Sequence, residues 1–177
     1  AAPLGADVPF VVRAAFPLGG LAVGEGTGTE LSIVELPEDM IPLDIVLVAA
    51  SEGLSTPQVF GELDAGRAAG HYPEGDTLIV PSGLLHALTQ NEAPIARLHE
   101  VGRQLRNDLQ APAVTLAPEL ETILTMDNES IVEAFVSGSG PTVAILVEDA
   151  PAADELAAAL RRRGRHVVAS QTPAEIA

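Results

Sequence analysis

Three residue types are missing from this 177-residue chain: cysteine, tryptophan and lysine. Without cysteine the chain has no disulfide bonds and no thiolate metal ligands, which fits the cytoplasmic location that we expect. All nine cationic side chains are arginines, so a lysine Schiff base and a lysine phosphate clamp are excluded within these residues. Aromatic residues make up only 3% of the chain, and Leu, Val, Ile and Ala must therefore pack the core.

Positive charge is also scarce, because 25 acidic residues stand against nine basic ones and the net charge is −16. Such a surface repels nucleic-acid phosphates and anionic lipids, so we expect neither nucleic acid nor a membrane as a partner. No apolar run is long enough to cross a bilayer, and no signal peptide is recognisable. An anionic ligand would need a local pocket of backbone N–H groups, since the overall field opposes it.

The most informative stretch that is present is a run of small residues between two apolar segments, 131–136 and 143–147, which we expect to be buried strands. The run consists of Ser137, Gly138, Ser139, Gly140 and Pro141. Small residues leave consecutive backbone N–H groups accessible, and these can curl around an anion. The same residues also suit a plain tight turn between strands, so both interpretations stand. The run is not a P-loop, because no Gly-Lys-Ser/Thr follows it.

Hydrophobic periodicity and helix-breaking residues predict the remaining elements. We expect strands at 8–12, 45–50, 77–80 and 166–169, a glycine hairpin over 19–34, and helices over 56–64, 82–92, 94–106, 111–126 with a break at Pro118, and 151–163. Asn107 or Asp108 is expected to cap the helix that follows. This order predicts an α+β sandwich in which the helices pack on one face of an antiparallel sheet.

Several other residues allow both a structural and a functional role. Asp7 either caps the junction before an apolar strand or holds a carboxylate at the edge of a site. Phe60 either packs in the core or stacks on a flat ligand. His86 and His99 lie far apart in the sequence and have no thiolate or paired acid to complete a ligand set, so we expect no metal site there. The arginines at 161–163 could bind phosphate, but the helix dipole favours a solvated helix end.

The run at 137–143, with its flanking strands, resembles the third conserved motif of the GHMP kinases, which phosphorylate small metabolites with ATP. Further stretches are similar to this family in the same order: Leu-Gly-Ala-Asp-Val-Pro-Phe at 4–10, the glycine hairpin at 19–28, Gly-Leu-Ser-Thr-Pro-Gln-Val-Phe at 53–60 and Asn-Asp-Leu at 107–109. The resemblance covers nearly the whole chain. The segment at 53–60 is most similar to the branch that phosphorylates the 2-hydroxyl of a cytidyl-linked alcohol in non-mevalonate isoprenoid biosynthesis. A homoserine, mevalonate or sugar kinase, and a non-catalytic ferredoxin-like binding module, remain alternatives.

The resemblance implies a division of the chain and a set of site residues. Residues 1–40 would be the end of the N-terminal, ATP-binding domain, and residues 41–177 a ferredoxin-like C-terminal domain. Asp7 would be the catalytic base, Thr56 and Pro57 would line the substrate pocket, and Phe60 would stack on the cytosine. Ser137, Gly138, Ser139 and Gly140 would shape the phosphate site.

The resemblance also implies ATP and Mg²⁺ and a small-molecule substrate, and it leaves the oligomeric state open. Two features that the family carries, a glycine- and serine-rich ATP loop and a catalytic lysine, belong before residue 1. The segment 13–18 is longer than the family pattern. The chain opens at Ala-Ala-Pro without methionine. We therefore expect a piece of a larger kinase that is inactive by itself.

Overall fold

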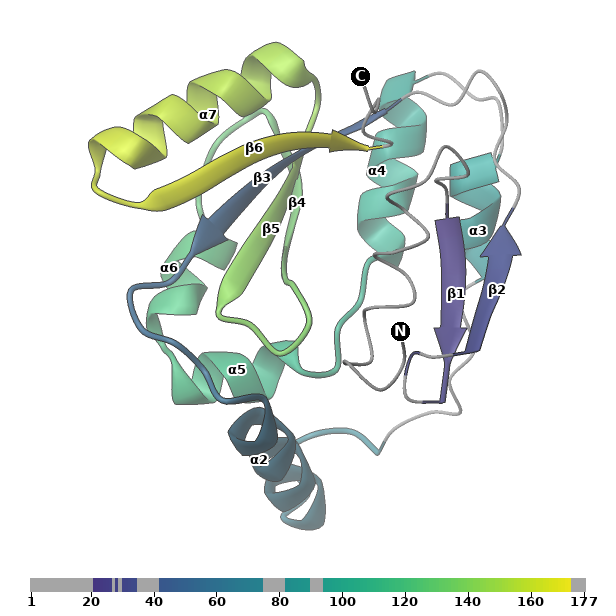
Figure 1. Ribbon diagram of the computed structural model, residues 1–177, viewed down its shortest axis with the longest axis vertical. Coiled ribbons are helices and arrows are strands. Elements are labelled where there is room, and N and C mark those ends of the chain that lie inside the picture. The colour runs from purple at the N-terminus through teal and green to yellow at the C-terminus, as the bar shows by residue number, and fades with distance from the viewer. Residues whose placement is uncertain are drawn as a thin grey trace.

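The computed structural model describes residues 21–26, 28, 30–34, 42–74, 82–89 and 94–172. The elements in chain order are β1 (Leu21–Glu25), β2 (Glu30–Val34), β3 (Leu43–Ala49), α2 (Thr56–Ala68), α3 (Ser82–Thr89), α4 (Pro94–Gln104), α5 (Gln110–Leu116), α6 (Glu119–Leu124), β4 (Ile131–Val136), β5 (Thr142–Val147), α7 (Ala150–Arg162) and β6 (His166–Thr172) (Figure 1). The expected strands at 8–12 and 77–80 and the expected domain boundary near residue 40 lie outside these ranges.

A four-stranded antiparallel sheet forms the centre of the molecule, with the strand order β4-β5-β3-β6. Alternate residues of β3 are buried, since successive side chains of a strand point to opposite faces. Val46 and Val48 have no exposed surface and lie opposite Ile145 and Val143 of β5. The apolar run at 143–147 is buried throughout, as expected for an inner strand covered on both faces.

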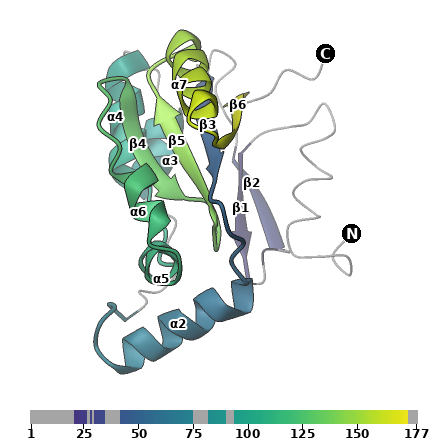
Figure 2. The same ribbon diagram turned by 90° about the vertical axis from the view of Figure 1, so that its left-hand side faces the viewer.

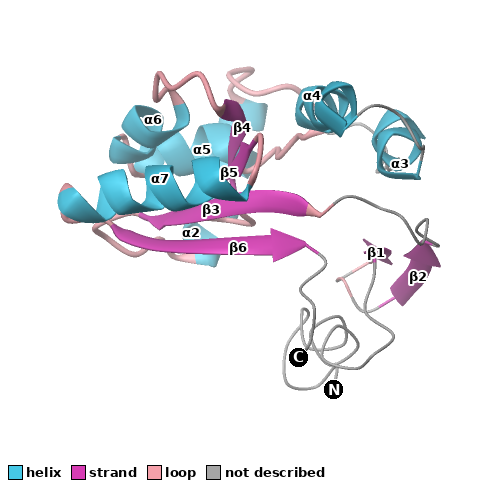
Figure 3. Cartoon of the chain, turned by 90° about the horizontal axis from the view of Figure 1, so that it is seen from above, coloured by secondary structure: helices cyan, strands magenta, loops and turns pink. Residues whose placement is uncertain are grey.

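Helix α7 covers the face of the sheet to which Val46 and Val48 belong (Figure 3). Its buried residues recur at helical spacing: Ala153, Leu156, Ala157 and Leu160. The helix begins where the Asp149 carboxylate accepts a hydrogen bond of 2.8 Å from the Ala152 N–H. It ends before Gly164, whose positive φ of 79° suits a glycine after a helix. The sequence predicted this helix almost to the residue.

The opposite face of the sheet is covered by α3 and α4. Leu98 and Val101 of α4 and Ala87 and Leu88 of α3 form a second core cluster with Leu146. Leu146 neighbours Ile145 in β5 and therefore points to the other face. The α+β class with an antiparallel sheet is confirmed, but the expectation that all helices pack on one face is wrong. Helical periodicity shows which side of a helix is apolar, and it does not show which face of a sheet that side will meet.

Helices α2, α5 and α6 lie at the end of the sheet where β4 turns into β5 (Figures 1 and 2). The predicted break falls at Pro118, which precedes α6. Helix α2 buries only Val59, Leu63 and Gly66 and is held to α5 by the ring and hydroxyl of Tyr72. The Tyr72 hydroxyl lies 2.9 Å from the Thr115 hydroxyl and donates to Glu62 at 3.2 Å.

The predicted glycine hairpin is confirmed in its strands. β1 and β2 pair antiparallel, with Leu21 opposite Val34 and Glu25 opposite Glu30. Gly26 and Gly28 in the connecting turn have positive φ angles of 62° and 81°. None of the helices within the described ranges is both long enough and apolar enough to traverse a bilayer.

Candidate functional site

The turn between β4 and β5 is shaped by two glycines with positive φ, 57° at Gly138 and 78° at Gly140. Two hydrogen bonds close it: the Ser137 N–H donates to Thr142 O at 2.8 Å and the Gly140 N–H to Ser137 O at 2.9 Å. The N–H groups of Gly138 and Ser139 have no partner among the described residues. A tight turn and an exposed pair of N–H groups therefore coexist here, and the two interpretations of this run do not exclude each other.

Helix α2 begins beside this turn. The Thr56 hydroxyl lies 2.8 Å from the Ser139 hydroxyl, although the two residues are 83 positions apart. Pro57 stands in the first turn of the helix, where its missing N–H costs no hydrogen bond. The first N–H groups of a helix carry partial positive charge. The start of α2 and the turn thus bring two sets of backbone dipoles and two hydroxyls to one place.

The turn also packs against the segment that leads into α2. A Cβ atom added at Gly140 would lie 3.3 Å from both Leu54 Cδ1 and Val136 Cγ1 and 3.8 Å from Ala113 Cβ. Just before that segment, the Ala50 N–H donates to Pro141 O at 3.1 Å. These contacts crowd position 140, so any side chain there would have to displace Leu54 or Val136, and they hold the turn against the body of the protein.

Asn107 holds the turn from the side of the loop before α5. Its carboxamide nitrogen lies 2.6 Å from Val136 O and 2.7 Å from Gly138 O, while its oxygen accepts the Leu109 N–H at 2.9 Å. The Gln110 side chain accepts the Val136 N–H at 3.0 Å. The expectation that Asn107 or Asp108 caps α5 is wrong, since Leu109 is the N-cap residue and no side chain bonds the first turn of the helix.

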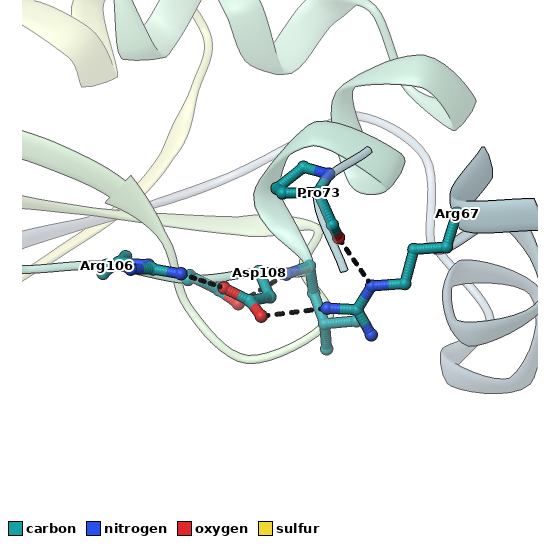
Figure 4. A network of polar contacts seen from close by, with 6 residues as sticks. Arg67, Pro73, Arg106 and Asp108 are labelled. Carbon is teal, nitrogen blue, oxygen red and sulfur yellow. Dashed lines mark hydrogen bonds and ion pairs between the residues drawn. The ribbon is translucent and has the colours of Figure 1, made fainter. Parts of the chain in front are cut away.

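Asp108 in the same loop joins it to the far end of α2 (Figure 4). Its carboxylate lies 3.0 Å from Arg67 and 3.4 Å from Arg106, and Arg67 also donates to Pro73 O at 3.0 Å. These side chains are partly exposed, so each ion pair contributes little by itself. Together with Tyr72 they fix the direction of a helix that buries few apolar side chains.

Phe60 lies one turn along α2 with 49% of its surface exposed, so it is not a core residue. A ring in this position is free to stack on a ligand.

Two shallow clefts share Ser51 in their linings. One, of about 310 Å³, is lined by residues 51–54 and 116–119, and the other, of about 410 Å³, is lined by residues 49–51 and 163–166.

The wall between these clefts is a charged network around Glu119. Ser51 donates to Glu119 through its hydroxyl at 2.6 Å and its N–H at 2.8 Å, and Arg165 donates at 2.9 Å. The hydrogen bond from the Ser51 hydroxyl, followed by that from Arg165, lowers the pKa of Glu119 to about 2. Glu119 therefore remains an anion at any physiological pH, and it offers no proton for catalysis.

The expected site residues fall into three groups. The structure brings Thr56 and Pro57 to the turn 137–140 and leaves Phe60 exposed on the same helix. Asp7 lies outside the described residues and stays a prediction. Among the residues that are described, no three His, Asp or Glu side chains lie close enough to hold a metal ion. The arginines at 161–163 are exposed at the end of α7, and Arg161 donates to Val167 O at 3.0 Å.

Sequence reasoning missed the roles of Asn107, Gln110 and Leu54 at the turn. Two signals marked the segment 107–109: it interrupts a helical pattern, and it resembles a motif of the GHMP kinases. Neither of them indicates which distant residues Asn107 contacts. Asn107 reaches residues 29 and 31 positions further along the chain.

Comparison with known proteins agrees with this geometry. Residues 85–166 match the family model described as GHMP kinases C terminal. Among curated proteins, the chain is 40% identical over 174 residues to the 4-diphosphocytidyl-2-C-methyl-D-erythritol kinase of Paenarthrobacter aurescens (strain TC1), with 98% of this chain and 51% of that protein aligned. It is 43% identical over 167 residues to the kinase of the same name from Nocardia farcinica, with 93% and 48% aligned. The chain thus spans about half the length of the curated relatives it matches.

Solved structures give the same picture. A crystal structure of 4-(cytidine 5'-diphospho)-2C-methyl-D-erythritol kinase superimposes with a TM-score of 0.69 at 28% identity, over 96% of this chain and 54% of that one. Homoserine kinase from Cytophaga hutchinsonii superimposes with a TM-score of 0.57 at 15% identity, over 91% and 50%, and shares the fold. Residues 85–166 are therefore a GHMP kinase C-terminal domain.

Proposed function

We propose that this chain is the substrate- and phosphate-binding part of a kinase that transfers the γ-phosphoryl group of ATP to the 2-hydroxyl of 4-diphosphocytidyl-2-C-methyl-D-erythritol. Relatives about 40% identical over 98% of the chain bear the name of that kinase, which supports the choice of substrate. The observation that carries the proposal is the 2.8 Å contact between the Thr56 and Ser139 hydroxyls. It joins the start of α2, which resembles a substrate segment, to the glycine turn, which resembles a phosphate segment.

The turn supplies the electrostatic part of this mechanism. Phosphoryl transfer depends mainly on positioning and on stabilising the charge that spreads over the transferred group. The N–H groups of Gly138 and Ser139 are free to donate to phosphate oxygens, and the N-terminal dipole of α2 adds to the same local field. In this role they offset the repulsion that a chain of net charge −16 exerts on a nucleotide.

The start of α2 supplies the substrate contacts. Thr56 and Pro57 line the pocket for the alcohol, and the exposed ring of Phe60 stacks on the cytosine base. A flat base buries apolar surface against such a ring and gains stacking energy of about 0.5–1.5 kcal/mol beyond burial.

Asp7 accepts the proton of the attacking hydroxyl in this proposal, a role that typically contributes about 100- to 10,000-fold in rate. Mg²⁺, which the family resemblance implies, would supply positive charge at the ATP phosphates. Among the described residues no three His, Asp or Glu side chains lie close enough to hold it. A chain without cysteine is suited to the cytoplasm, where we expect the reaction to occur.

The test is a phosphotransfer assay on the protein encoded by the complete reading frame that contains this chain. We expect ATP-dependent phosphorylation of the cytidyl alcohol and none of homoserine, mevalonate or free sugars. Turnover with one of the other alcohols would assign a different GHMP kinase, and turnover with none would favour a non-catalytic module. The 177-residue chain assayed alone should be inactive.

Two variants of the complete protein test the roles of individual residues. Asp7→Asn should leave nucleotide binding nearly intact and lower kcat strongly. Phe60→Ala should raise KM for the cytidyl alcohol, whereas Val168→Ala, which removes another exposed apolar side chain (58% exposed) on β6, should leave KM unchanged. Equal KM values for the two variants would remove Phe60 from the substrate site.

A further inference from the structure

The carboxamide of Asn107 is anchored on both of its polar atoms. Its nitrogen donates to Val136 O and Gly138 O, at 2.6 Å and 2.7 Å, and its oxygen accepts the Leu109 N–H. A carboxamide nitrogen carries two hydrogens, so each carbonyl receives one. The reverse orientation would set the carboxamide oxygen against two carbonyl oxygens, and the network therefore admits a single orientation.

These two hydrogen bonds fix the direction of two peptide planes in the turn. The peptide bond between Gly138 and Ser139 is trans, since only the bond from Gly140 to Pro141 is cis among the described residues. In a planar trans peptide the C=O and N–H bonds point in opposite directions. Because Gly138 O faces Asn107, the Ser139 N–H must face away from it. By the same geometry, holding Val136 O directs the Ser137 N–H to its acceptor Thr142 O.

The loop that carries Asn107 is itself held in place. Asp108, the next residue, lies 3.0 Å from Arg67 of α2, and Gln110 accepts the Val136 N–H at 3.0 Å. The anchor is therefore held from α2 as well as from the end of β4.

We propose that Asn107 is a positioning residue of this kinase: it touches no substrate, and by binding the Gly138 carbonyl it directs the Ser139 N–H toward the phosphoryl group. This inference rests on the function proposed above and adds a residue to it. Without the carboxamide nitrogen, the peptide plane between Gly138 and Ser139 can rotate, because glycine has no Cβ atom and so limits its backbone dihedral angles less than any other residue.

A purely structural role for Asn107 makes a different prediction. The bond from the Leu109 N–H to the Asn107 oxygen forms a local turn, and that turn could be the whole contribution of the residue. The chain holds a matched case: Asn128 accepts the Ser130 N–H at 2.9 Å in the same i to i+2 pattern. The Asn128 carboxamide nitrogen has no partner among the described residues.

Three variants of the complete kinase separate the two roles. Asn107→Asp keeps the acceptor for the Leu109 N–H but loses both donors, Asn107→Ala loses both donors and the acceptor, and Asn128→Asp is the matched control. We expect Asn107→Asp and Asn107→Ala to lower kcat by a similar factor, about 100-fold, the usual consequence of a misplaced catalytic group. In both Asn107 variants, KM for the cytidyl alcohol should stay near that of the unchanged protein. Asn128→Asp should have the same kcat and the same KM as the unchanged protein.

If Asn107→Asp retains full kcat while Asn107→Ala loses it, the local turn is all that matters and the proposal is overturned. Thermal unfolding midpoints, measured on each variant, separate a loss of turnover from a loss of folded protein.

Carboxamide hydrogen exchange on the unchanged complete protein, followed by NMR, tests the anchor without any variant and without activity. Both carboxamide hydrogens of Asn107 should exchange much more slowly than those of Asn128. Equal rates would show that the anchor is absent and would overturn the proposal. A protected Asn107 in a complete protein that phosphorylates no alcohol would refute the proposed function alone. A working kinase in which Asn107→Asp is fully active would refute the positioning role alone.

Discussion

Replacing Gly140 by alanine tests whether the turn is shaped by backbone conformation alone or also by the crowding around it. Gly140 has a φ of 78°, which an alanine adopts only at a cost of about 1–2 kcal/mol. The added Cβ atom would also lie 3.3 Å from Leu54 Cδ1 and Val136 Cγ1, closer than ordinary packing allows. Val136 ends β4 and is 1% exposed, so it has little room to move.

Gly138→Ala is the matched control. Gly138 has a φ of 57° in the same turn, but a Cβ atom there would meet nothing within 4 Å. Both substitutions reduce the freedom of the unfolded chain, so most of that effect cancels between them, although Gly140 precedes Pro141 and is already more restricted there. We expect Gly138→Ala to cost about 1–2 kcal/mol for its positive φ alone. Gly140→Ala should cost about 1 kcal/mol more, the lower end of the range for overpacking a core.

Urea unfolding of the two variants gives the answer. At an m-value of about 2 kcal/mol/M, an extra 1 kcal/mol lowers the midpoint of Gly140→Ala by about 0.5 M relative to Gly138→Ala. Gly164→Ala serves as a second control, since its φ is 79° and the space around it is open, at the end of α7. Equal midpoints for Gly138→Ala and Gly140→Ala would refute the crowding argument and, with it, the claim that Leu54 and Val136 fix the turn.

Three further predictions concern the elements around the site. Gly66→Ala places a Cβ atom 2.2 Å from the ring of Tyr72, so the ring must move away from α2. The free energy of unfolding should fall by about 2 kcal/mol, and the fluorescence of the single tyrosine should change. Gly61→Ala, in open space on the same helix, should instead raise the free energy of unfolding by about 0.5–1 kcal/mol. In the unchanged protein the lowered pKa of Glu119 means that its contribution to the unfolding free energy is full above pH 4.5 and is lost as the pH falls toward about 2. Glu119→Gln should remove that pH dependence and lower the free energy of unfolding by about 1–2 kcal/mol at neutral pH. Glu121→Gln, on the same helix, is the control and should have neither effect. Urea unfolding at several pH values measures both. Asp149→Ala, which removes the cap of α7, should cost about 1 kcal/mol in a thermal unfolding experiment, whereas Asp154→Ala, on the exposed side of that helix, should cost much less.

The parts of the fold that follow local rules could be predicted from the sequence. α7 carries its proline, cap and final glycine within a few residues of its ends, and the apolar runs beside the turn 137–140 admit little besides strands. The placement of α4 could not be predicted, because an apolar helix side fits either face of a sheet. Sequence periodicity also left Phe60 undecided between core and surface.

The sequence predicted which residues belong to the site, but it did not predict which of them contact one another. The small residues at 137–140 already indicated accessible N–H groups. Their contacts with Thr56 and Asn107 span 83 and up to 31 positions of sequence, and no local pattern encodes such pairs. A carboxamide that orients a peptide plane from a distant loop is visible only once both segments have coordinates.

The place of β3 between β5 and β6 has a consequence for how the protein is made. Leu43 at the start of β3 donates to the Thr172 side chain, 129 positions later. At about 5–20 residues per second, a ribosome needs about 6–26 s to synthesise the segment between them. Both edges of this apolar strand lack a partner until β5 is made, and the edge that pairs with β6 lacks one for the whole interval. A nascent chain stalled before residue 166 would expose that edge to chaperones or to other nascent chains. Translation speed between residues 49 and 166 should therefore affect the yield of folded protein more than speed elsewhere in the message.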